Sequence, residues 1–285
     1  MRFLACLMVP LLCCAHESPE HRIEQLSFEM ARSGESPEAL LQRAIEHRAL
    51  GDFEAASADF RTVLSFATNS IEALKGLSEI QKAQGKFEEA LKTINRAIGT
   101  GAELYFTRAE IYAAAGNDQL ALADCARAFA GRDGELEWYL TRAQIQSRLR
   151  RFEDCVKGLK EGVEATGSAV LKAELIEALI DAGKYREALR EIEPELREAR
   201  LRSAWLLRRA RARVGMGKDA RKDLAEALEE LNARIHPRSP DVTLLVERGM
   251  VLALLGQTEA ARADLARALH AGSALVWRLE RLLSR

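Results

Sequence analysis

One short phrase recurs along most of this 285-residue chain, and its spacing constrains the fold more than any other feature. The phrase opens with glycine, usually has an aromatic residue two positions later, and ends in alanine or another small residue. Its first six copies start 31 to 34 residues apart, and the seventh follows after a longer interval. The seven copies start at Gly51, Gly85, Gly116, Arg150, Gly183, Gly215 and Gly256. Such a period predicts one structural unit that is built many times.

Each position in the phrase has a physical meaning. The glycine predicts the end of a helix, because it readily adopts the left-handed conformation of a helix C-cap. The aromatic and small residues that follow lie near the start of a second helix, where alanine lets two helices cross closely. Before each glycine, apolar residues lie three and four apart, as at Leu104, Tyr105, Ala109 and Tyr112. This is the spacing of an amphipathic helix, so each unit is expected to be helix, tight turn, helix.

These rows resemble the tetratricopeptide repeat, a helix-turn-helix unit with a period of 34 residues. The resemblance covers residues 37–271, and Trp138 and Trp205 lie near the row in which that repeat has tryptophan. It implies an all-α, right-handed superhelical solenoid of about seven repeats with a C-terminal capping helix. We expect repeats over residues 37–70, 71–101, 102–135, 136–168, 169–202, 203–235 and 242–271.

The segments that flank the repeats carry helix signals of their own. Ser18-Pro19-Glu20 and Ser36-Pro37-Glu38 each place a capping serine before a proline and an acid, which favours a helix start. Residues 16–36 are therefore expected to form a short helix over the first repeat or a tether. Residues 272–285 carry a stripe of leucines that predicts either a helix capping the last repeat or an exposed docking helix.

Two features predict irregularity within the repeats. Pro194 falls inside a predicted helix, where proline removes a hydrogen bond and kinks or breaks the helix. A longer connection runs from Asn232 to Asp241 and is either a functional insertion or a spacer.

The first fifteen residues predict export. Arg2 precedes an apolar run that ends in small residues at Ala15, which is typical of a secretory signal peptide. Cleavage there would leave a free periplasmic or secreted protein. The segment is also similar to a bacterial lipoprotein signal, with Cys14 or Cys13 as the lipidated residue, which would anchor the protein at the cell envelope.

Two cysteines, Cys125 and Cys155, remain after this segment. Each lies in an apolar row of a predicted helix, so we expect two small buried side chains rather than a disulfide.

Charged residues also follow the repeat. Arginines occupy one row of the first helix in four units, and aspartates occupy one row of the second helix in the same units. The expected pairs are Arg43–Asp59, Arg108–Asp124, Arg209–Asp223 and Arg248–Asp264. We expect them to bridge the two helices of a unit and to be worth little if exposed. Arg142 departs from the pattern because Gly158 occupies the aspartate position.

Helical solenoids bind partners along the surface formed by the first helix of each unit. The candidate residues for this surface are Lys75, Glu79, Phe106, Glu110, Leu140, Gln144, Glu174, Glu177, Arg208 and Arg211. They describe an acidic, partly apolar groove beside an arginine-rich sixth unit. Such a groove is expected to accept a positive segment at its middle and an acidic one near the sixth unit, unless it is only a solvated surface.

No pattern in the sequence indicates catalysis. The five histidines lack zinc-ligand spacing, and there is no phosphate-binding loop or nucleophile elbow, so we expect no cofactor and no enzyme activity. A net charge of −1 argues against nucleic acid as a partner, and contact with a membrane is expected only through a lipid anchor. The expected function is a non-catalytic scaffold for a protein or peptide partner. The alternatives are an assembly or structural lipoprotein of an envelope complex and a regulatory subunit of an enzyme complex.

Overall fold

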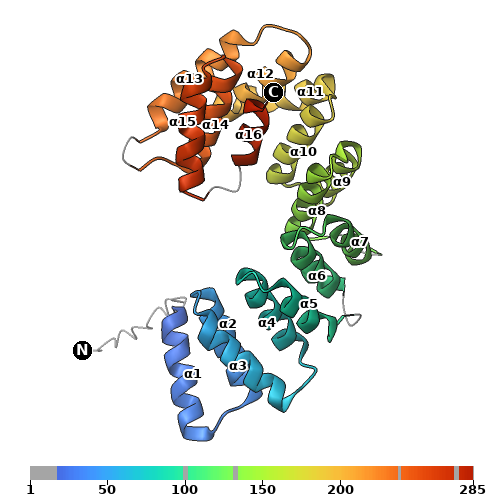
Figure 1. The fold of residues 1–285 in the computed structure, drawn as a ribbon, viewed down its shortest axis with the longest axis vertical. Coiled ribbons are helices and arrows are strands. Elements are labelled where there is room, and N and C mark those ends of the chain that lie inside the picture. Colours follow the sequence, from blue (N-terminus) through green and yellow to red (C-terminus); the bar gives the residue numbers. More distant parts are fainter. Residues whose placement is uncertain (1–17, 99–101, 131–133, 237–238, 273–275, 285) are drawn as a thin grey trace, which may run out of the picture. The chain divides into compact units, whose positions relative to one another are not determined.

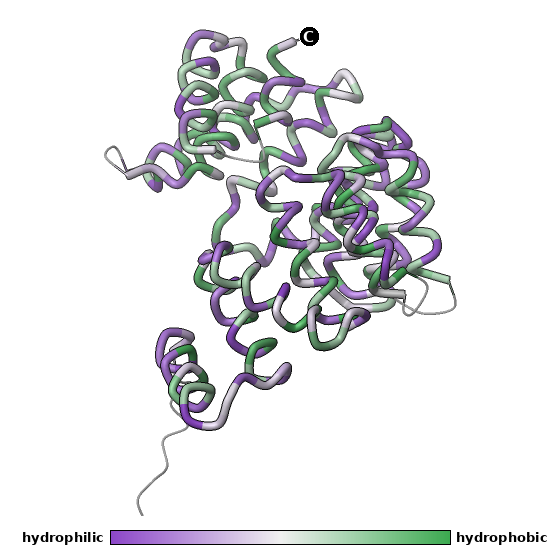
Figure 2. The backbone as a smooth tube through the Cα atoms, turned by 60° about the horizontal axis from the view of Figure 1, so that its bottom comes forward, coloured by the Kyte–Doolittle hydropathy of each residue, from purple (hydrophilic) through white to green (hydrophobic). Residues whose placement is uncertain are grey.

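The structure is a computed structural model that describes residues 18–98, 102–130, 134–236, 239–272 and 276–284 (Figure 1). All regular elements in these ranges are α-helices, numbered α1 to α16. The expected export segment, including Cys14, lies outside the described residues. Polar and apolar residues alternate along the helices, as expected for elements that each bury one face (Figure 2).

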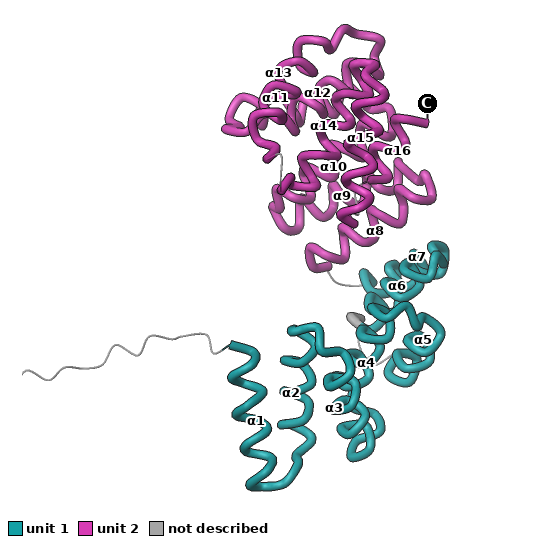
Figure 3. Tube along the Cα trace, turned by 60° about the vertical axis from the view of Figure 1, so that its left-hand side comes forward, with its two compact units in different colours: residues 1–132 teal, residues 133–285 magenta. Residues whose placement is uncertain are grey.

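Contacts divide the chain into two compact units, residues 1–132 and residues 133–285, and each unit is described by itself (Figure 3). The helices of unit 1 are α1 (Pro19–Ser33), α2 (Pro37–Ala49), α3 (Phe53–Phe66), α4 (Ile71–Ala83), α5 (Phe87–Asn95), α6 (Ala102–Ala114) and α7 (Asp118–Ala128). The helices of unit 2 are α8 (Leu136–Arg148), α9 (Phe152–Thr166), α10 (Ala169–Asp181), α11 (Tyr185–Glu198), α12 (Ser203–Gly215), α13 (Arg221–Arg234), α14 (Val242–Leu254), α15 (Thr258–His270) and α16 (Val276–Leu283).

Within each unit, consecutive helices pack against each other, and alternate helices also meet. In unit 1, α2 contacts α4 and α4 contacts α6; in unit 2, α8, α10, α12 and α14 form the corresponding row. We call each row the first-helix surface of its unit. This arrangement is that of an all-α helical solenoid, in which every repeat packs on its neighbours.

The turns lie at the predicted copies of the phrase. One copy has arginine in place of glycine, and in another the left-handed glycine comes two residues later. Gly51, Gly85, Gly116, Gly183 and Gly256 all have positive φ. At the fourth copy Arg150 has a φ of 57°, the only positive φ of a non-glycine residue in the described chain. In the shortened sixth copy Gly217 holds the left-handed conformation, while Gly215 is still helical and lies against the ring of Tyr185.

Small residues at the end of each phrase are buried at helix crossings, as predicted. Their exposed fractions are 0% at Ala56, Ala90, Ala121, Ala188 and Ala261. Cys155 occupies the same row and is 1% exposed, and Cys125 is also buried with a free thiol. The prediction of two small buried cysteines is confirmed, because Cys155 replaces alanine at a crossing.

All four predicted Arg–Asp pairs form, and each guanidinium donates two hydrogen bonds to its carboxylate. The N–O distances are 2.7 and 2.8 Å for Arg43–Asp59, 2.6 and 2.9 Å for Arg108–Asp124, 3.0 and 2.8 Å for Arg209–Asp223, and 2.8 and 2.6 Å for Arg248–Asp264. The aspartate side chains are at most 9% exposed, so the pairs are not the surface bridges that the sequence alone suggested. In the fourth repeat, where Gly158 stands in place of the aspartate, Arg142 donates to the carbonyl oxygen of Gly158 at 3.0 Å.

The flanking helices are both docked. Helix α1 packs on α2 and contributes Leu26 and Met30 to the core of unit 1. Helix α16 packs on α14 and α15 and buries Leu279 completely, so the capping alternative for the C-terminal stripe is the one observed.

Helix α11 runs unbroken through Pro194, contrary to the predicted irregularity. A single hydrogen bond is lost, while Ile192 and Leu196 remain buried on either side of the proline.

Candidate partner-binding surface

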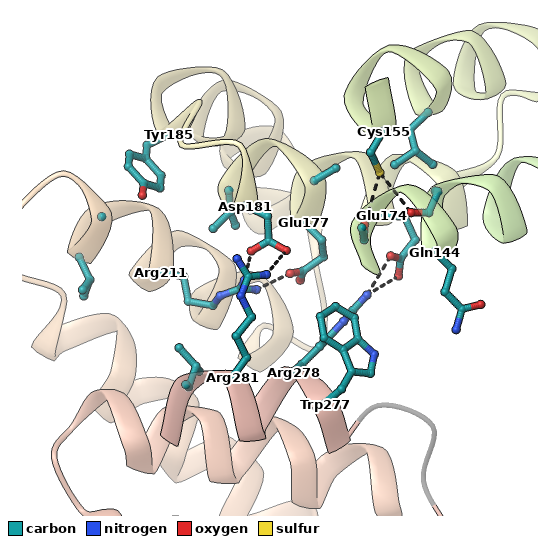
Figure 4. A pocket seen from close by; sticks show the side chains of 18 of the residues that line it. Gln144, Cys155, Glu174, Glu177, Asp181, Tyr185, Arg211, Trp277, Arg278 and Arg281 are labelled. Carbon is teal, nitrogen blue, oxygen red and sulfur yellow. Dashed lines mark hydrogen bonds and ion pairs between the residues drawn. The ribbon is translucent and has the colours of Figure 1, made fainter. Parts of the chain in front are cut away.

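A cavity with a volume of about 320 Å³ lies on the first-helix surface of unit 2. Helices α8, α10 and α12 form one side of it, and α16 forms the other (Figure 4). Of the residues expected on this surface, Leu140, Gln144, Glu174, Glu177 and Arg211 line the cavity. Candidate residues from successive repeats, which lie far apart in the sequence, therefore come together at this cavity.

Three acidic side chains supply the negative charge of this cavity. Glu174, Glu177 and Asp181 lie on α10 at spacings of three and four residues, which places them on one face of the helix. Glu177 is only 9% exposed, and the other two are half-buried. Carboxylates buried to this degree require positive partners, and the structure supplies those partners from two directions.

One set of partners comes from α16. Arg278 donates to both carboxylate oxygens of Glu174, at 3.0 and 2.8 Å. Arg281 donates to Asp181 at 2.9 Å. The two arginines are three residues apart, so they project from one face of α16 toward α10 (Figure 4).

The second set comes from α12. Arg208 lies 2.9 Å from Glu177, and Arg211 pairs with Glu177 as well and with Asp181 at 3.4 Å. Burial alone would raise the pKa of Glu177, but the positive charges of Arg211, Arg208 and Arg278, with the hydrogen bond from Arg211, lower this pKa to about 2. Glu177 is therefore ionised throughout the neutral range.

A fourth acid, Glu247 on α14, lines a smaller adjoining pocket with Glu177, Arg208 and Arg278. Burial raises the pKa of Glu247, and the charges of Arg208 and Arg234 offset only part of this effect. Glu247 lies one position before Arg248, in the same row as the candidates Glu174 and Arg208, but it was not among the residues predicted from the sequence.

Most of the remaining residues that line the cavity are apolar. Leu140, Val214, Leu254, Trp277 and Leu282 contribute to its wall. The thiol of Cys155 reaches the same wall, where it donates to the carbonyl oxygen of Ala143, and burial raises the pKa of that thiol. The cavity thus combines apolar and charged side chains, which is the composition of a site for an amphipathic segment.

Unit 1 carries the other four candidates, on α4 and α6. Glu79 pairs with Arg48, and Glu110 pairs with Lys82 at 3.3 Å. The Lys75 side chain is half-buried. Phe106 is only 7% exposed, so it is part of the buried core and not an open contact surface, contrary to the sequence prediction.

A second series of ion pairs, which was not predicted from the sequence, links neighbouring repeats along the first-helix surface. The series comprises Arg48–Glu79, Lys82–Glu110, Glu177–Arg208 and Glu177–Arg211. Its members are roughly one repeat apart and opposite in charge, so the repeat period did contain the signal. The groove acids are consequently paired, and the groove is less negative than their number suggested.

Within the described residues, every helix is too short or too polar to span a bilayer. No group of three or more His, Cys, Asp and Glu side chains in these residues is placed so that it could hold a metal ion.

Comparison with known proteins places this architecture. No protein-family model and no curated protein matches the sequence. A crystal structure of a tetratricopeptide repeat protein from Parabacteroides merdae superposes with a TM-score of 0.65 and 20% identity, over 87% of this chain and 99% of that one. Yeast Tom70 gives a TM-score of 0.57 at 15% identity, over 92% of this chain and 57% of Tom70.

A third similar structure is the Cut9–Hcn1 hetero-tetramer of the APC/C, with a TM-score of 0.57 at 14% identity, over 88% of this chain and 48% of that one. At these identities the likeness concerns the fold. The chain has the fold of a tetratricopeptide repeat protein, as the repeated phrase predicted.

Proposed function

We propose that this protein is a non-catalytic scaffold that binds a segment of a partner protein on the first-helix surface of unit 2. The observation that carries the proposal is the cavity of about 320 Å³, which is lined by apolar side chains and by partly buried charges on α10, α12 and α16. A cavity with apolar walls and a few fixed charges can accept an apolar side chain and orient the segment that carries it.

The fold supports the same proposal. Stacked helical repeats present a preformed surface, so little conformational entropy is lost when a partner docks. One of the structurally similar chains was crystallised as part of the Cut9–Hcn1 hetero-tetramer, so a chain of this fold does assemble with a second protein.

Site-specific photo-crosslinking tests the proposal directly. A photoreactive residue at Gln144, which is exposed and lines the cavity, should capture a partner in the native host. The same residue at Arg262, exposed on α15, is the matched control. Capture at residue 144 that disappears when Glu174 and Asp181 are changed to lysine is the expected result. Equal capture at both positions, or none at residue 144, would contradict the proposal.

Export and anchoring form a separate part of the proposal and rest on residues 1–15. A signal peptide would place the scaffold in the periplasm or outside the cell, and lipidation of Cys14 would place it at the cell envelope as an assembly lipoprotein. The mass of the mature N-terminus separates these outcomes. A start at His16 indicates a free scaffold, a lipidated Cys14 indicates an anchored one, and an intact Met1 contradicts both.

A further inference from the structure

Helix α16 is held in two different ways on its two sides. On one side its apolar residues pack on the last repeat, where Leu279 is fully buried against Gly249 of α14. On the side that faces α10, it is held by the ion pairs Arg278–Glu174 and Arg281–Asp181. These partners are 104 and 100 residues apart in the sequence, so the α10 contact is a separate docking interaction and not part of the repeat stacking.

The charges around α10 balance only when α16 is present. Four acids, Glu174, Glu177, Asp181 and Glu247, meet four arginines, Arg208, Arg211, Arg278 and Arg281. Two of the arginines belong to α16. Without it, the four acids would keep only Arg208 and Arg211 as unshared partners, because Arg234, which also acts on Glu247, is paired with Glu230. The surface would then become negative and attractive to a basic segment.

The fit between α16 and the first-helix surface is incomplete. The cavity lies between them, and Trp277, at the start of α16, lines it while remaining 37% exposed. Protein interiors are normally filled to the density of organic crystals. An interface that leaves this volume open can accept a segment with larger or differently placed apolar side chains.

We propose that α16 occupies the partner surface of unit 2 as an internal ligand, and that the partner presents a basic amphipathic helix of the same kind. Such a helix carries two arginines or lysines three positions apart, for Glu174 and Asp181, beside a large apolar side chain for the cavity. This inference rests on the proposed function, because it names the chemistry of the partner and the segment that the partner displaces.

A peptide with the sequence of residues 273–285 serves as the probe. It is labelled with a fluorophore, and its binding to the full chain is followed by anisotropy. The wild-type chain should bind it weakly, because its own α16 fills the surface. The variant Arg278→Glu, Arg281→Glu should release α16 and bind the wild-type peptide at least about tenfold more tightly, since the fraction of open surface sets the apparent affinity.

Two controls isolate the effect. Arg221→Glu, Arg262→Glu makes the same change in net charge at exposed positions and should leave peptide binding at the wild-type level. A peptide with both arginines replaced by glutamate should not bind the released variant. Hydrogen exchange at the α16 amides should become faster in the released variant, while exchange in α9 and α13 of the same unit stays unchanged and reports that its repeats remain folded.

The proposal is overturned if the double variant binds the wild-type peptide no better than the wild-type chain does. It is equally overturned if the α16 amides of that variant still exchange as slowly as those of α14. Crosslinking at residue 144 is independent of both measurements. A partner captured there without peptide binding would leave the scaffold function standing and remove only the internal-ligand inference.

Discussion

Arg150 shows how strictly the repeat imposes its backbone. It holds a φ of 57° at a turn where the other copies have glycine, a conformation that costs an L-residue roughly 1 kcal/mol or more. The sequence row predicted a turn here although the glycine is absent. The tertiary packing of α8 and α9 thus enforces a conformation that the local sequence disfavours.

Replacing Arg150 with glycine should therefore stabilise the protein by about 0.5–1 kcal/mol, because the strain is relieved. Chemical denaturation monitored by circular dichroism measures the change. Arg190→Gly, at an exposed position inside α11, is the control and should destabilise by about 1 kcal/mol. Destabilisation by Arg150→Gly would mean that the turn is not strained.

The buried aspartates give the Arg–Asp pairs more weight than exposed bridges would have. Arg43→Met should lower the free energy of unfolding by about 3 kcal/mol, because it leaves the buried Asp59 carboxylate without its partner. The double variant Arg43→Met, Asp59→Leu should recover most of this loss. Arg61→Met, at an exposed neighbouring position, should change stability by less than about 0.5 kcal/mol. A single variant as stable as the wild type would contradict the burial argument.

Glu177 couples stability to pH. Its pKa is about 2 in the folded chain against an ordinary value of 4.5, so its ionised form contributes stability at and above pH 4.5. That contribution, about 3 kcal/mol, should be lost as the pH falls from about 4.5 to about 2. Glu177→Gln should be less stable than the wild type at pH 7, with a gap that narrows over this interval. A gap that stays constant from pH 7 to pH 2.5 would show that the carboxylate is not responsible.

At the scale of the helices, close crossings explain why particular positions are small. A Cβ atom placed on Gly76 of α4 would lie 2.3 to 2.8 Å from three ring atoms of Phe60 on α3. Such an approach requires the buried ring of Phe60 or one of the two helices to move. The packing of α3 on α4 therefore depends on the missing side chain.

Gly76→Ala should accordingly destabilise the protein by about 1–3 kcal/mol, although alanine at an unhindered helix position would stabilise it by about 1 kcal/mol. The sign of the change in chemical denaturation decides between the two. The double variant Gly76→Ala, Phe60→Leu has room for the new methyl group. Its loss of stability should therefore be smaller than the sum of the losses in the two single variants. Stabilisation by Gly76→Ala alone would disprove the close crossing.

At the scale of the whole molecule, stability is a sum over neighbouring repeats and not the property of one central core. Leu279→Ala removes a fully buried side chain that packs on Gly249 of α14, and should destabilise unit 2 by about 2–5 kcal/mol. Hydrogen exchange should become faster in α14 and α16 and remain unchanged in α2 to α5 of unit 1. A uniform increase over both units would mean that the chain unfolds as a single cooperative body.

The sequence determined the features that repeat. It predicted the helix-turn-helix units, the glycine turns, the buried small residues and all four Arg–Asp pairs, because each joins residues within one repeat period and recurs at the same position. The pairs between neighbouring first helices, such as Lys82–Glu110, also follow the period but were hidden by the high density of charge. Pro194 was misjudged because a helix with buried residues on both sides of a proline tolerates one missing hydrogen bond.

Only the tertiary structure decided where the C-terminal helix docks and what it does to the candidate site. Leucine spacing predicts that α16 has an apolar face, but nothing local specifies that Arg278 and Arg281 meet acids about 100 residues earlier. That meeting depends on how α10, α12 and α14 stack, which is the sum of many small packing choices. Because of these contacts, the acids of α10, which the sequence suggested were available to a partner, are paired with arginines beside the cavity. Such pairing is required because a buried carboxylate without a positive partner is strongly destabilising.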